Sequence, residues 1–209
     1  MSLVEKETMS QAPKFNLPPI VLASASPRRA EILKLVGWQF EKITADINET
    51  PLKTEMPDSY VERLARTKAK SVAAKIESGL VLGADTIVVL NDEIIGKPTD
   101  LIDARKMLEK LSGNWHDVLT GVCLFKKTAD NLTYRIAHQK TRVKFAALKN
   151  AEIDWLIESG APLDKAGAYA VQGAAALFIE RIEGDYWNVV GLPIELVYRL
   201  TNEITEKQK

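Results

Sequence analysis

The stretch Val81-Leu82-Gly83-Ala84-Asp85-Thr86-Ile87-Val88-Val89-Leu90 decides the fold of this chain. Its apolar and β-branched residues fall on both pleat faces, which predicts a strand buried on both sides of a sheet. Asp85 is the one charged residue in the stretch. Because an unpaired buried carboxylate is costly, we expect Asp85 to meet a cation, a metal ion or a water-filled cleft and so to mark a functional site. The alternatives are that Asp85 begins a turn or pairs with an arginine for structural reasons alone.

Helical and strand patterns alternate around this central strand. The sequence predicts further strands over residues 20–23, 38–44, 118–126, 134–145 and 177–182. It predicts helices over residues 27–36, 60–76, 101–111 and 150–158, and a last helix that begins at residue 193. A turn over residues 127–131 makes its two flanking strands antiparallel neighbours. Together these patterns predict an α/β fold with a mixed sheet and flanking helices, in one domain over residues 19–205 that follows a disordered tail over residues 1–18.

Composition narrows the classes of protein to which the chain can belong. It has 209 residues, with 28 Lys and Arg against 28 Asp and Glu, and a zero formal charge argues against a general nucleic-acid-binding protein. No apolar run is long enough to span a membrane, and the N-terminal segment does not resemble a signal peptide. Cys123 is the only cysteine, so no intrachain disulfide can form, as is typical of a reducing compartment. We expect a cytoplasmic protein whose partners include neither nucleic acid nor membrane.

A basic segment joins the first predicted strand to the first predicted helix. It reads Leu22-Ala23-Ser24-Ala25-Ser26-Pro27-Arg28-Arg29, and a helix N-terminus with its free N–H groups and its dipole favours anions. Arg28 and Arg29 oppose that dipole unless an anionic ligand lies beside them, and a guanidinium binds phosphate through paired hydrogen bonds. The segment therefore indicates phosphate binding, and the alternative is a solvated basic turn.

Three other charged residues are candidates for the same site. Lys68 lies in the apolar stripe of the helix predicted over residues 60–76, so its side chain either extends to water or reaches a buried anion. Lys97 lies in a Gly-Lys-Pro turn, where it contacts a phosphate or simply faces solvent. Glu49 and Asp85 offer the hard oxygen ligands that Mg²⁺ takes, one or two carboxylates at a time, although nothing local shows that they meet.

The motifs of several other enzyme classes are absent from the sequence. There is no GxxxxGK[ST] or GxGxxG loop, no GxSxG elbow and no HExxH or CxxC pair. The two histidines, His116 and His138, have no catalytic partner pattern. The arginines, lysines and carboxylates that remain are typical of metal-assisted phosphate chemistry.

Five motifs in this order resemble the Maf family of nucleoside triphosphate pyrophosphatases, also called septum-formation inhibitor-like proteins. The resemblance extends over about residues 20–200. It implies an elongated α/β fold similar to that of the inosine triphosphate pyrophosphatases, with a central mixed sheet and a cleft. Proteins of this fold are often homodimers, while the sequence itself leaves the oligomeric state open. The motifs are Ser24-Ala25-Ser26-Pro27-Arg28-Arg29, Gly83-Ala84-Asp85-Thr86, Gly96-Lys97-Pro98, Asp164-Lys165-Ala166-Gly167-Ala168-Tyr169-Ala170-Val171-Gln172-Gly173 and Val189-Val190-Gly191-Leu192-Pro193.

The resemblance implies hydrolysis of a nucleoside triphosphate to its monophosphate and pyrophosphate, with a divalent cation such as Mg²⁺, or else Mn²⁺ or Co²⁺, as cofactor. Asp85 matches the general base of the family and a ligand of the metal. Glu49 matches a second carboxylate ligand in a loop that varies among members. Polar and basic residues of the cleft are matched by Ser24, Arg29, Lys68 and Lys97.

Three residues match the branch of the family that acts on dTTP and UTP. They are Arg28 in the helical turn, Thr86 after the aspartate and Gln172 in the late loop, and we expect them to recognise the pyrimidine base. The branch that prefers 7-methyl-GTP has an aromatic residue in place of Arg28. The alternatives that stay open are the same reaction on 7-methyl-GTP or modified nucleotides, release of orthophosphate instead, and a nucleotide-binding regulator of cell division without turnover.

Overall fold

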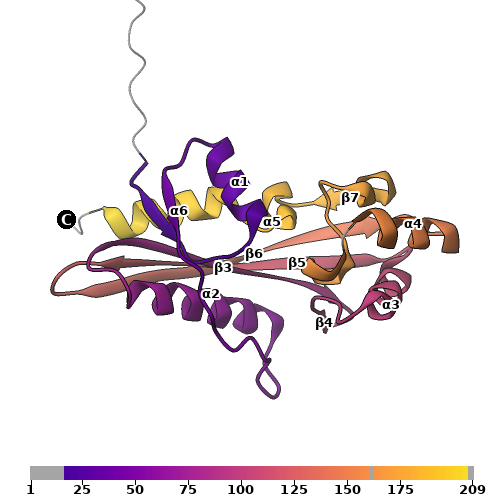
Figure 1. Ribbon diagram of the computed structural model, residues 1–209, viewed down its shortest axis with the longest axis horizontal. Helices are drawn as coiled ribbons and strands as arrows, with labels where there is room; N and C mark the ends of the chain where they lie inside the picture. The colour runs from indigo at the N-terminus through magenta and orange to yellow at the C-terminus, as the bar shows by residue number, and fades with distance from the viewer. Residues whose placement is uncertain (1–16, 161, 207–209) are drawn as a thin grey trace, which may run out of the picture.

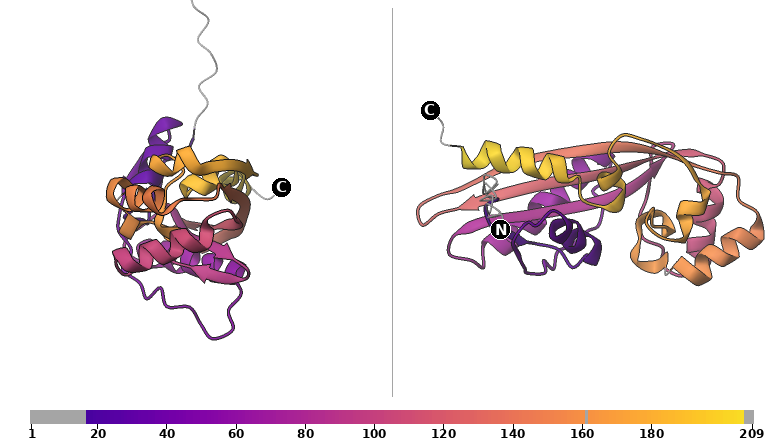
Figure 2. Two further views of the ribbon diagram at one scale, coloured as in Figure 1. Left: turned by 90° about the vertical axis from the view of Figure 1, so that its right-hand side faces the viewer. Right: turned by 90° about the horizontal axis from the view of Figure 1, so that it is seen from above.

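The computed structural model describes residues 17–160 and 162–206, and it shows an elongated molecule built on one twisted sheet (Figures 1 and 2). Helix α2 covers one face of the sheet, while α1, α5 and α6 lie on the other face (Figure 1). Helices α3 and α4 gather at one end of the sheet, and the β5–β6 hairpin reaches the opposite end (Figure 2). The predicted α/β fold with flanking helices is therefore confirmed.

Within the described residues, seven strands form the sheet, and six of them follow the order β2-β1-β3-β5-β6-β7, with β4 paired to β3. β1 is parallel to β2 and to β3, whereas all other pairs are antiparallel, so the sheet is mixed as predicted. The strands are β1 (Ile20–Leu22), β2 (Phe40–Lys42), β3 (Gly79–Leu90), β4 (Glu93–Ile95), β5 (Trp115–Lys127), β6 (Leu132–Phe145) and β7 (Ile179–Glu183).

Strand β3 is paired along nearly its whole length on one side but not on the other. Antiparallel β5 accompanies it from Gly79 to Val89. On the opposite side, β1 pairs only with residues 80–82 and β4 only with residues 88–90. Residues 83–87 lie between these two pairings, with Asp85 at their centre. The chain leaves β1 at Ala23 to enter α1, and this departure opens the edge of β3 at the predicted site.

Six α-helices and three short 3₁₀ turns are found in the described residues. Pro27 begins α1 at its first position, as predicted, and Gly37 follows its end with a φ of 70°. The Asp100 side chain caps α3 by accepting a hydrogen bond from the Asp103 N–H at 2.7 Å. The helices are α1 (Pro27–Leu35), α2 (Pro57–Ala73), α3 (Leu101–Leu111), α4 (Asn150–Gly160), α5 (Tyr186–Val190) and α6 (Ile194–Thr205), and the 3₁₀ turns are η1 (Pro162–Asp164), η2 (Ala166–Ala168) and η3 (Ala174–Phe178).

Several predicted boundaries were wrong. Helix α2 begins at Pro57 because that proline suits the first position of a helix, and it ends at Ala73 although the apolar pattern continues to Ile76. The strand predicted over residues 177–182 begins only at Ile179, since η3 occupies the residues before it. The short helix α5 was not predicted. Residues 1–16, which make up most of the predicted tail, lie outside the described residues.

Two glycines let helix α2 lie directly against the sheet. A Cβ atom at Gly83 would lie 2.2 Å from the Ala65 carbonyl oxygen, and one at Gly121 would lie 2.3 Å from the Val61 carbonyl oxygen. Both distances are shorter than any real contact of a Cβ atom, so each position accepts no side chain without moving the helix. This close approach brings Lys68, which is on the sheet-facing stripe of α2, within reach of Asp85 on β3.

We predict that Gly121→Ala lowers the free energy of unfolding by at least about 1–3 kcal/mol, the usual scale of overpacking, because α2 must move away from β5. Urea unfolding measures the change. Gly96→Ala is the matched control, since a Cβ atom at Gly96 meets nothing within 4 Å. Equal stabilities of the two variants would contradict the proposed contact.

Candidate active site

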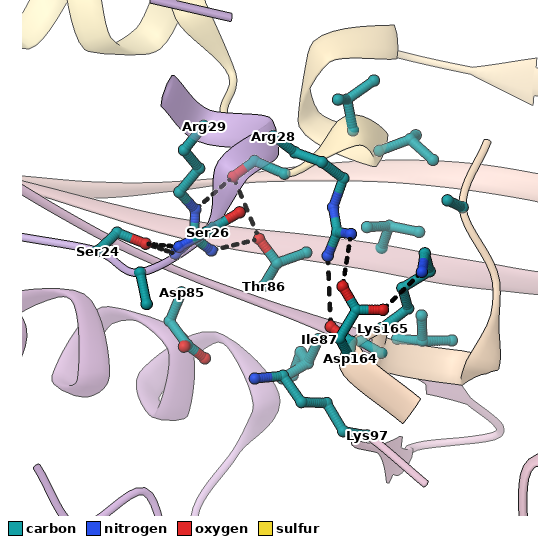
Figure 3. Close-up of a pocket in the computed structure, with 18 of the residues that line it drawn as sticks. Ser24, Ser26, Arg28, Arg29, Asp85, Thr86, Ile87, Lys97, Asp164 and Lys165 are labelled. Atoms are coloured by element: carbon teal, nitrogen blue, oxygen red, sulfur yellow. Dashed lines mark hydrogen bonds and ion pairs between the residues drawn. The ribbon is translucent and has the colours of Figure 1, made fainter. Parts of the chain in front are cut away.

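A pocket of about 420 Å³ lies against the open edge of β3 (Figure 3). Its walls are the β1–α1 connection, the loop around Glu49, the turn at Gly96 and Lys97, and the late loop over residues 164–172. The pocket is open to solvent and its lining is strongly charged. All the residues predicted for the site line it, namely Ser24, Arg28, Arg29, Glu49, Lys68, Asp85, Thr86, Lys97 and Gln172.

Asp85 meets a cation, as its place in a buried strand predicts. Its Oδ1 atom accepts a hydrogen bond from Lys68 Nζ at 2.6 Å, and Asp85 is only 8% exposed. The same ammonium lies 2.6 Å from Glu49 Oε1, so Lys68 bridges the two carboxylates. Lys68 therefore does not extend to solvent but reaches the buried Asp85 carboxylate, which was one of its two predicted interpretations. Its ammonium has a third hydrogen, which it can give to a ligand.

The loop that carries Glu49 is held by two residues of α2. The Tyr60 hydroxyl donates to the Glu49 carbonyl oxygen at 2.7 Å, and Arg63 donates to the Thr50 carbonyl oxygen at 3.2 Å. Burial, followed by the charges of Asp85 and Glu49, raises the pKa of Tyr60 to about 12, so its hydroxyl stays a donor. Sequence reasoning missed Tyr60, because at the start of an apolar stripe it is typical of a core residue.

Glu49 is ionised in this environment. Burial alone would raise the pKa of its carboxyl, but the hydrogen bond and charge of Lys68, with smaller effects from Lys97 and Arg29, outweigh it and lower the pKa below the ordinary 4.5. Figure 3 shows the Lys97 side chain extending toward the same space as the Asp85 carboxylate. The turn of Lys97 is joined to the late loop, since the Gly167 N–H donates to the Gly96 carbonyl oxygen at 3.0 Å.

Arg29 is a buried part of the pocket wall. It is 8% exposed, and four of its five N–H groups are used by the protein itself. Nε donates to the Gly191 carbonyl oxygen at 2.9 Å, Nη1 to Ser24 Oγ and the Ala84 carbonyl oxygen, and Nη2 to Thr86 Oγ1 at 3.0 Å. Burial lowers the pKa of Arg29, and the nearby Asp85 charge opposes this effect. A contact between Arg29 and phosphate stays a prediction, and the fifth N–H is the group left to make it.

Ser24 offers a hydroxyl donor at the end of β1. Its Oγ accepts hydrogen bonds from Arg29 Nη1 at 3.0 Å and from the Ser26 N–H at 3.2 Å. These bonds use both lone pairs of the oxygen, so the hydroxyl proton is what remains for a ligand. Ser26 stands at the N-cap position of α1, but its side chain makes no capping hydrogen bond, which leaves this helix N-terminus open toward the pocket.

An ion pair crosses the pocket from Arg28 to the late loop. Arg28 Nη1 donates to Asp164 Oδ2 at 3.2 Å, and Lys165 Nζ lies 2.5 Å from Asp164 Oδ1 (Figure 3). Burial raises the pKa of Asp164, but Lys165 and then Arg28 outweigh burial, so the net shift is downward. Asp164 and Lys165 belong to a motif that the sequence singled out without giving either residue a role.

A buried pair anchors the late loop to the sheet. The Tyr169 hydroxyl lies 2.7 Å from His116 Nε2, and both side chains are buried beside Phe145. Burial lowers the pKa of His116 to about 4 and raises that of Tyr169, so both groups are neutral at physiological pH. His116 is therefore a structural residue, in agreement with the lack of a catalytic histidine pattern in the sequence.

The carboxylates of Asp85 and Glu49 suit a hard divalent cation that takes its other ligands from substrate phosphates and water. In the part of the chain that the structure describes, no group of three or more His, Cys, Asp or Glu side chains could hold a metal ion. Asp85 and Glu49 are brought together by Lys68, and each has a second oxygen beyond the one it gives to that lysine. Two carboxylates with substrate phosphates and water are a usual set of ligands for Mg²⁺.

The fold and pocket define an α/β protein with a cation-lined site for an anionic ligand, and comparisons with known proteins give its family. The chain belongs to the Maf-like protein family, whose model matches residues 19–204. A dTTP/UTP pyrophosphatase of Symbiobacterium thermophilum is 45% identical over 184 residues, which are 88% of this chain and 93% of that protein. A dTTP/UTP pyrophosphatase of Geotalea uraniireducens is 50% identical over 175 residues, which are 84% of this chain and 89% of that protein.

The fold is also shared with a solved structure of low sequence identity. A HAM1 protein from Coxiella burnetii has a TM-score of 0.51 and 18% identity, and the match covers 91% of this chain and all of that one. Within residues 17–160 and 162–206, no helix is both long and apolar enough to cross a membrane.

We predict a pH-dependent difference in stability between the native protein and Glu49→Gln. Because the pKa of Glu49 is lower in the folded state, the contribution of its ionised form to stability is complete well above pH 4.5 and is lost as the pH falls below 4.5. The difference in the free energy of unfolding should therefore be largest near neutrality and shrink in acid. Urea unfolding at several values between roughly pH 3 and 7 measures it.

The control for this prediction is Glu77→Gln, an exposed position outside the pocket. The difference in the free energy of unfolding between Glu77→Gln and the native protein should not follow the same pH dependence. A Glu49→Gln difference that is constant over the whole range would contradict the ion pair with Lys68.

Proposed function

We propose that this protein hydrolyses dTTP and UTP to the monophosphate and pyrophosphate. The observation that carries the proposal is the position of Asp85, which is held by Lys68 on an open strand edge inside a cation-lined pocket. Membership of the Maf-like family and the curated relatives that are dTTP/UTP pyrophosphatases support it. A regulator that only binds nucleotides would gain nothing from a carboxylate facing a triphosphate.

Asp85 acts as the general base in the proposed reaction. Lys68 binds Oδ1 and thereby fixes the orientation of the carboxylate. Oδ2 has two lone pairs, so it can accept a hydrogen bond from a water molecule and also bind the cation. Asp85 takes a proton from this water as the water oxygen attacks the α-phosphorus, and the bond from the α-phosphorus to the pyrophosphate oxygen breaks. Positioned proton transfer of this kind contributes about 10²–10⁴-fold.

The cationic residues bind the triphosphate and stabilise the leaving pyrophosphate. Lys97 and Lys68 both line the pocket, and Ser24 adds a hydroxyl donor beside the N-terminus of α1. Such preorganised charges and donors stabilise the transition state without having to reorganise, and in many enzymes this stabilisation lowers the reaction barrier more than any other effect. When a divalent cation is bound by Asp85 and Glu49, it supplies charge neutralisation of the phosphates.

We assign recognition of the nucleotide base to the late loop and the first turn of α1, which both line the pocket. Gln172 on the late loop presents an amide with both a donor and an acceptor, which suits the edge of a pyrimidine, and Arg28 lines the same pocket. A site built on such groups rejects bases that leave them unpaired. The same reaction on 7-methyl-GTP or modified nucleotides is the alternative, and a panel of triphosphates assayed for pyrophosphate with and without Mg²⁺ distinguishes them. Cytoplasmic location and a homodimer stay predictions of the sequence.

We predict that Asp85→Asn folds but loses over about 100-fold in turnover of UTP, because the amide cannot accept the proton of the attacking water. Pyrophosphate release under saturating UTP measures the rate, and thermal unfolding checks the fold. Glu180→Gln, at an exposed site on β7, is the control and should retain full turnover. Near-normal turnover of Asp85→Asn would remove Asp85 from the role of base, and release of orthophosphate would contradict the proposed reaction.

We predict that Gln172→Ala raises KM for UTP more than KM for GTP, since only the pyrimidine loses hydrogen bonds of the amide. One lost hydrogen bond to a neutral group is worth about 0.5–1.5 kcal/mol, so we expect the ratio of KM for UTP to KM for GTP to rise roughly 3–10-fold. Lys53→Ala, on an exposed loop outside the pocket, serves as control. Equal changes for both nucleotides would show that Gln172 does not read the base.

A further inference from the structure

A chain of hydroxyl groups lies behind the pocket and ends on Arg29. Thr86 Oγ1 accepts from Arg29 Nη2 at 3.0 Å and lies 2.9 Å from Thr120 Oγ1 on the neighbouring strand β5. The two threonines are partners in the β3–β5 register. Thr120 is completely buried, does not line the pocket, and lies 3.3 Å from the Asn188 carbonyl oxygen of α5.

The hydroxyl groups of Thr86 and Thr120 can be arranged with two hydrogen-bond directions, and in both the Thr86 proton is donated to another group of the protein. It goes to Thr120 Oγ1 at 2.9 Å, with Thr120 donating to Asn188, or it goes to the Gly191 carbonyl oxygen at 3.4 Å, with Thr120 donating to Thr86. In both arrangements a lone pair of Thr86 faces the guanidinium of Arg29. The Thr86 hydroxyl therefore accepts a hydrogen bond from Arg29 in both arrangements and helps to hold the guanidinium in place.

Arg29 in turn joins three pieces of the pocket wall. Its other N–H groups hold the Ser24 hydroxyl, the Ala84 carbonyl oxygen next to Asp85, and the Gly191 carbonyl oxygen after α5. The Ala84 contact replaces the strand that is missing at the open edge of β3. A shift of the guanidinium would move the Ser24 hydroxyl and the backbone next to Asp85, the proposed general base, together. This movement would be the same whatever nucleotide is bound.

We propose that Thr120 is a positioning residue of this enzyme, which sets the placement of Arg29 through the Thr86 hydroxyl. The proposal rests on the proposed function, because its main readout is the hydrolysis of nucleoside triphosphates. It gives Thr86 the role of holding Arg29 in the pocket wall, and this role does not depend on which nucleotide base is bound. The sequence instead predicts that Thr86 recognises the pyrimidine. A positioning role affects the turnover of UTP and GTP equally, whereas a recognition role affects pyrimidine nucleotides alone.

The main test is Thr120→Val compared with Thr120→Ser. Valine puts a methyl group where a hydroxyl lies 2.9 Å from Thr86 Oγ1, and carbon–oxygen contacts need about 3.3–3.6 Å, so Thr86 must move away from Arg29. Turnover should fall roughly tenfold, the scale of one hydrogen bond, and by the same factor for UTP and GTP. Thr120→Ser keeps the hydroxyl and should stay within about twofold of the native rate by the same scale.

Two controls separate this role from a loss of stability. Thr201→Val removes another fully buried hydroxyl, one that bonds the Val197 carbonyl oxygen inside α6 away from the pocket. It should lower the melting temperature yet leave turnover unchanged at a temperature well below unfolding. In a Thr86→Val background, Thr120→Val should add no further loss of turnover, since both residues act through one chain.

The outcomes distinguish this proposal from the function on which it rests. If the native protein releases no pyrophosphate from UTP, the proposed function fails. If the native protein is active, then full turnover of Thr120→Val, lack of rescue by serine, additive losses with Thr86→Val, or a loss confined to pyrimidine nucleotides would each overturn the positioning role. Uniform loss with serine rescue supports it.

Discussion

The contact between helix α2 and the two glycines of the sheet is the constraint on which the site depends. It brings a lysine from an apolar helix stripe against an aspartate from an apolar strand, and neither charge could be buried without the other. Asp85 alone would be a costly interruption of β3, and Lys68 alone would extend to solvent. Their pairing makes both positions stable, and Glu49, on a loop tied to the same helix, shares the ammonium.

The second constraint is the incomplete pairing of β3, which creates the pocket and also exposes backbone groups. β1 leaves the sheet after Leu22, and β4 begins to pair only at residue 88, so the edge beside Asp85 needs another partner. Arg29 fills this place with a side chain, and it donates to the Ala84 carbonyl oxygen as a neighbouring strand would. A buried arginine that forms four hydrogen bonds is rigid, whereas Lys68 and Lys97 keep hydrogens for a ligand.

The sequence allowed the mixed α/β fold to be predicted from local patterns. Local patterns also indicated the charged residues of the pocket, whereas Thr86 and Gln172 were predicted only from the family resemblance. The alternating elements and the odd charge at Asp85 are visible without a structure. What could not be predicted is set by contacts between distant segments. Tyr60 and Thr120 look like ordinary core residues, and only the register of β3 with β5 places the Thr120 hydroxyl behind Thr86. The end of α2 at Ala73 and the short helix α5 likewise follow from tertiary packing, which overrides local propensity.

The balance of charge in the pocket explains why the proposed reaction calls for a divalent cation. Five cationic side chains and three carboxylates line the pocket, which gives a net charge of +2. A nucleoside triphosphate carries roughly four negative charges at neutral pH, counting the second ionisation of its terminal phosphate. The pocket alone therefore leaves about two charges unbalanced, and carrying that excess into a partly buried site is unfavourable. A divalent cation at Asp85 and Glu49 removes the excess, so the two carboxylates, which would otherwise repel the substrate, become part of what binds it.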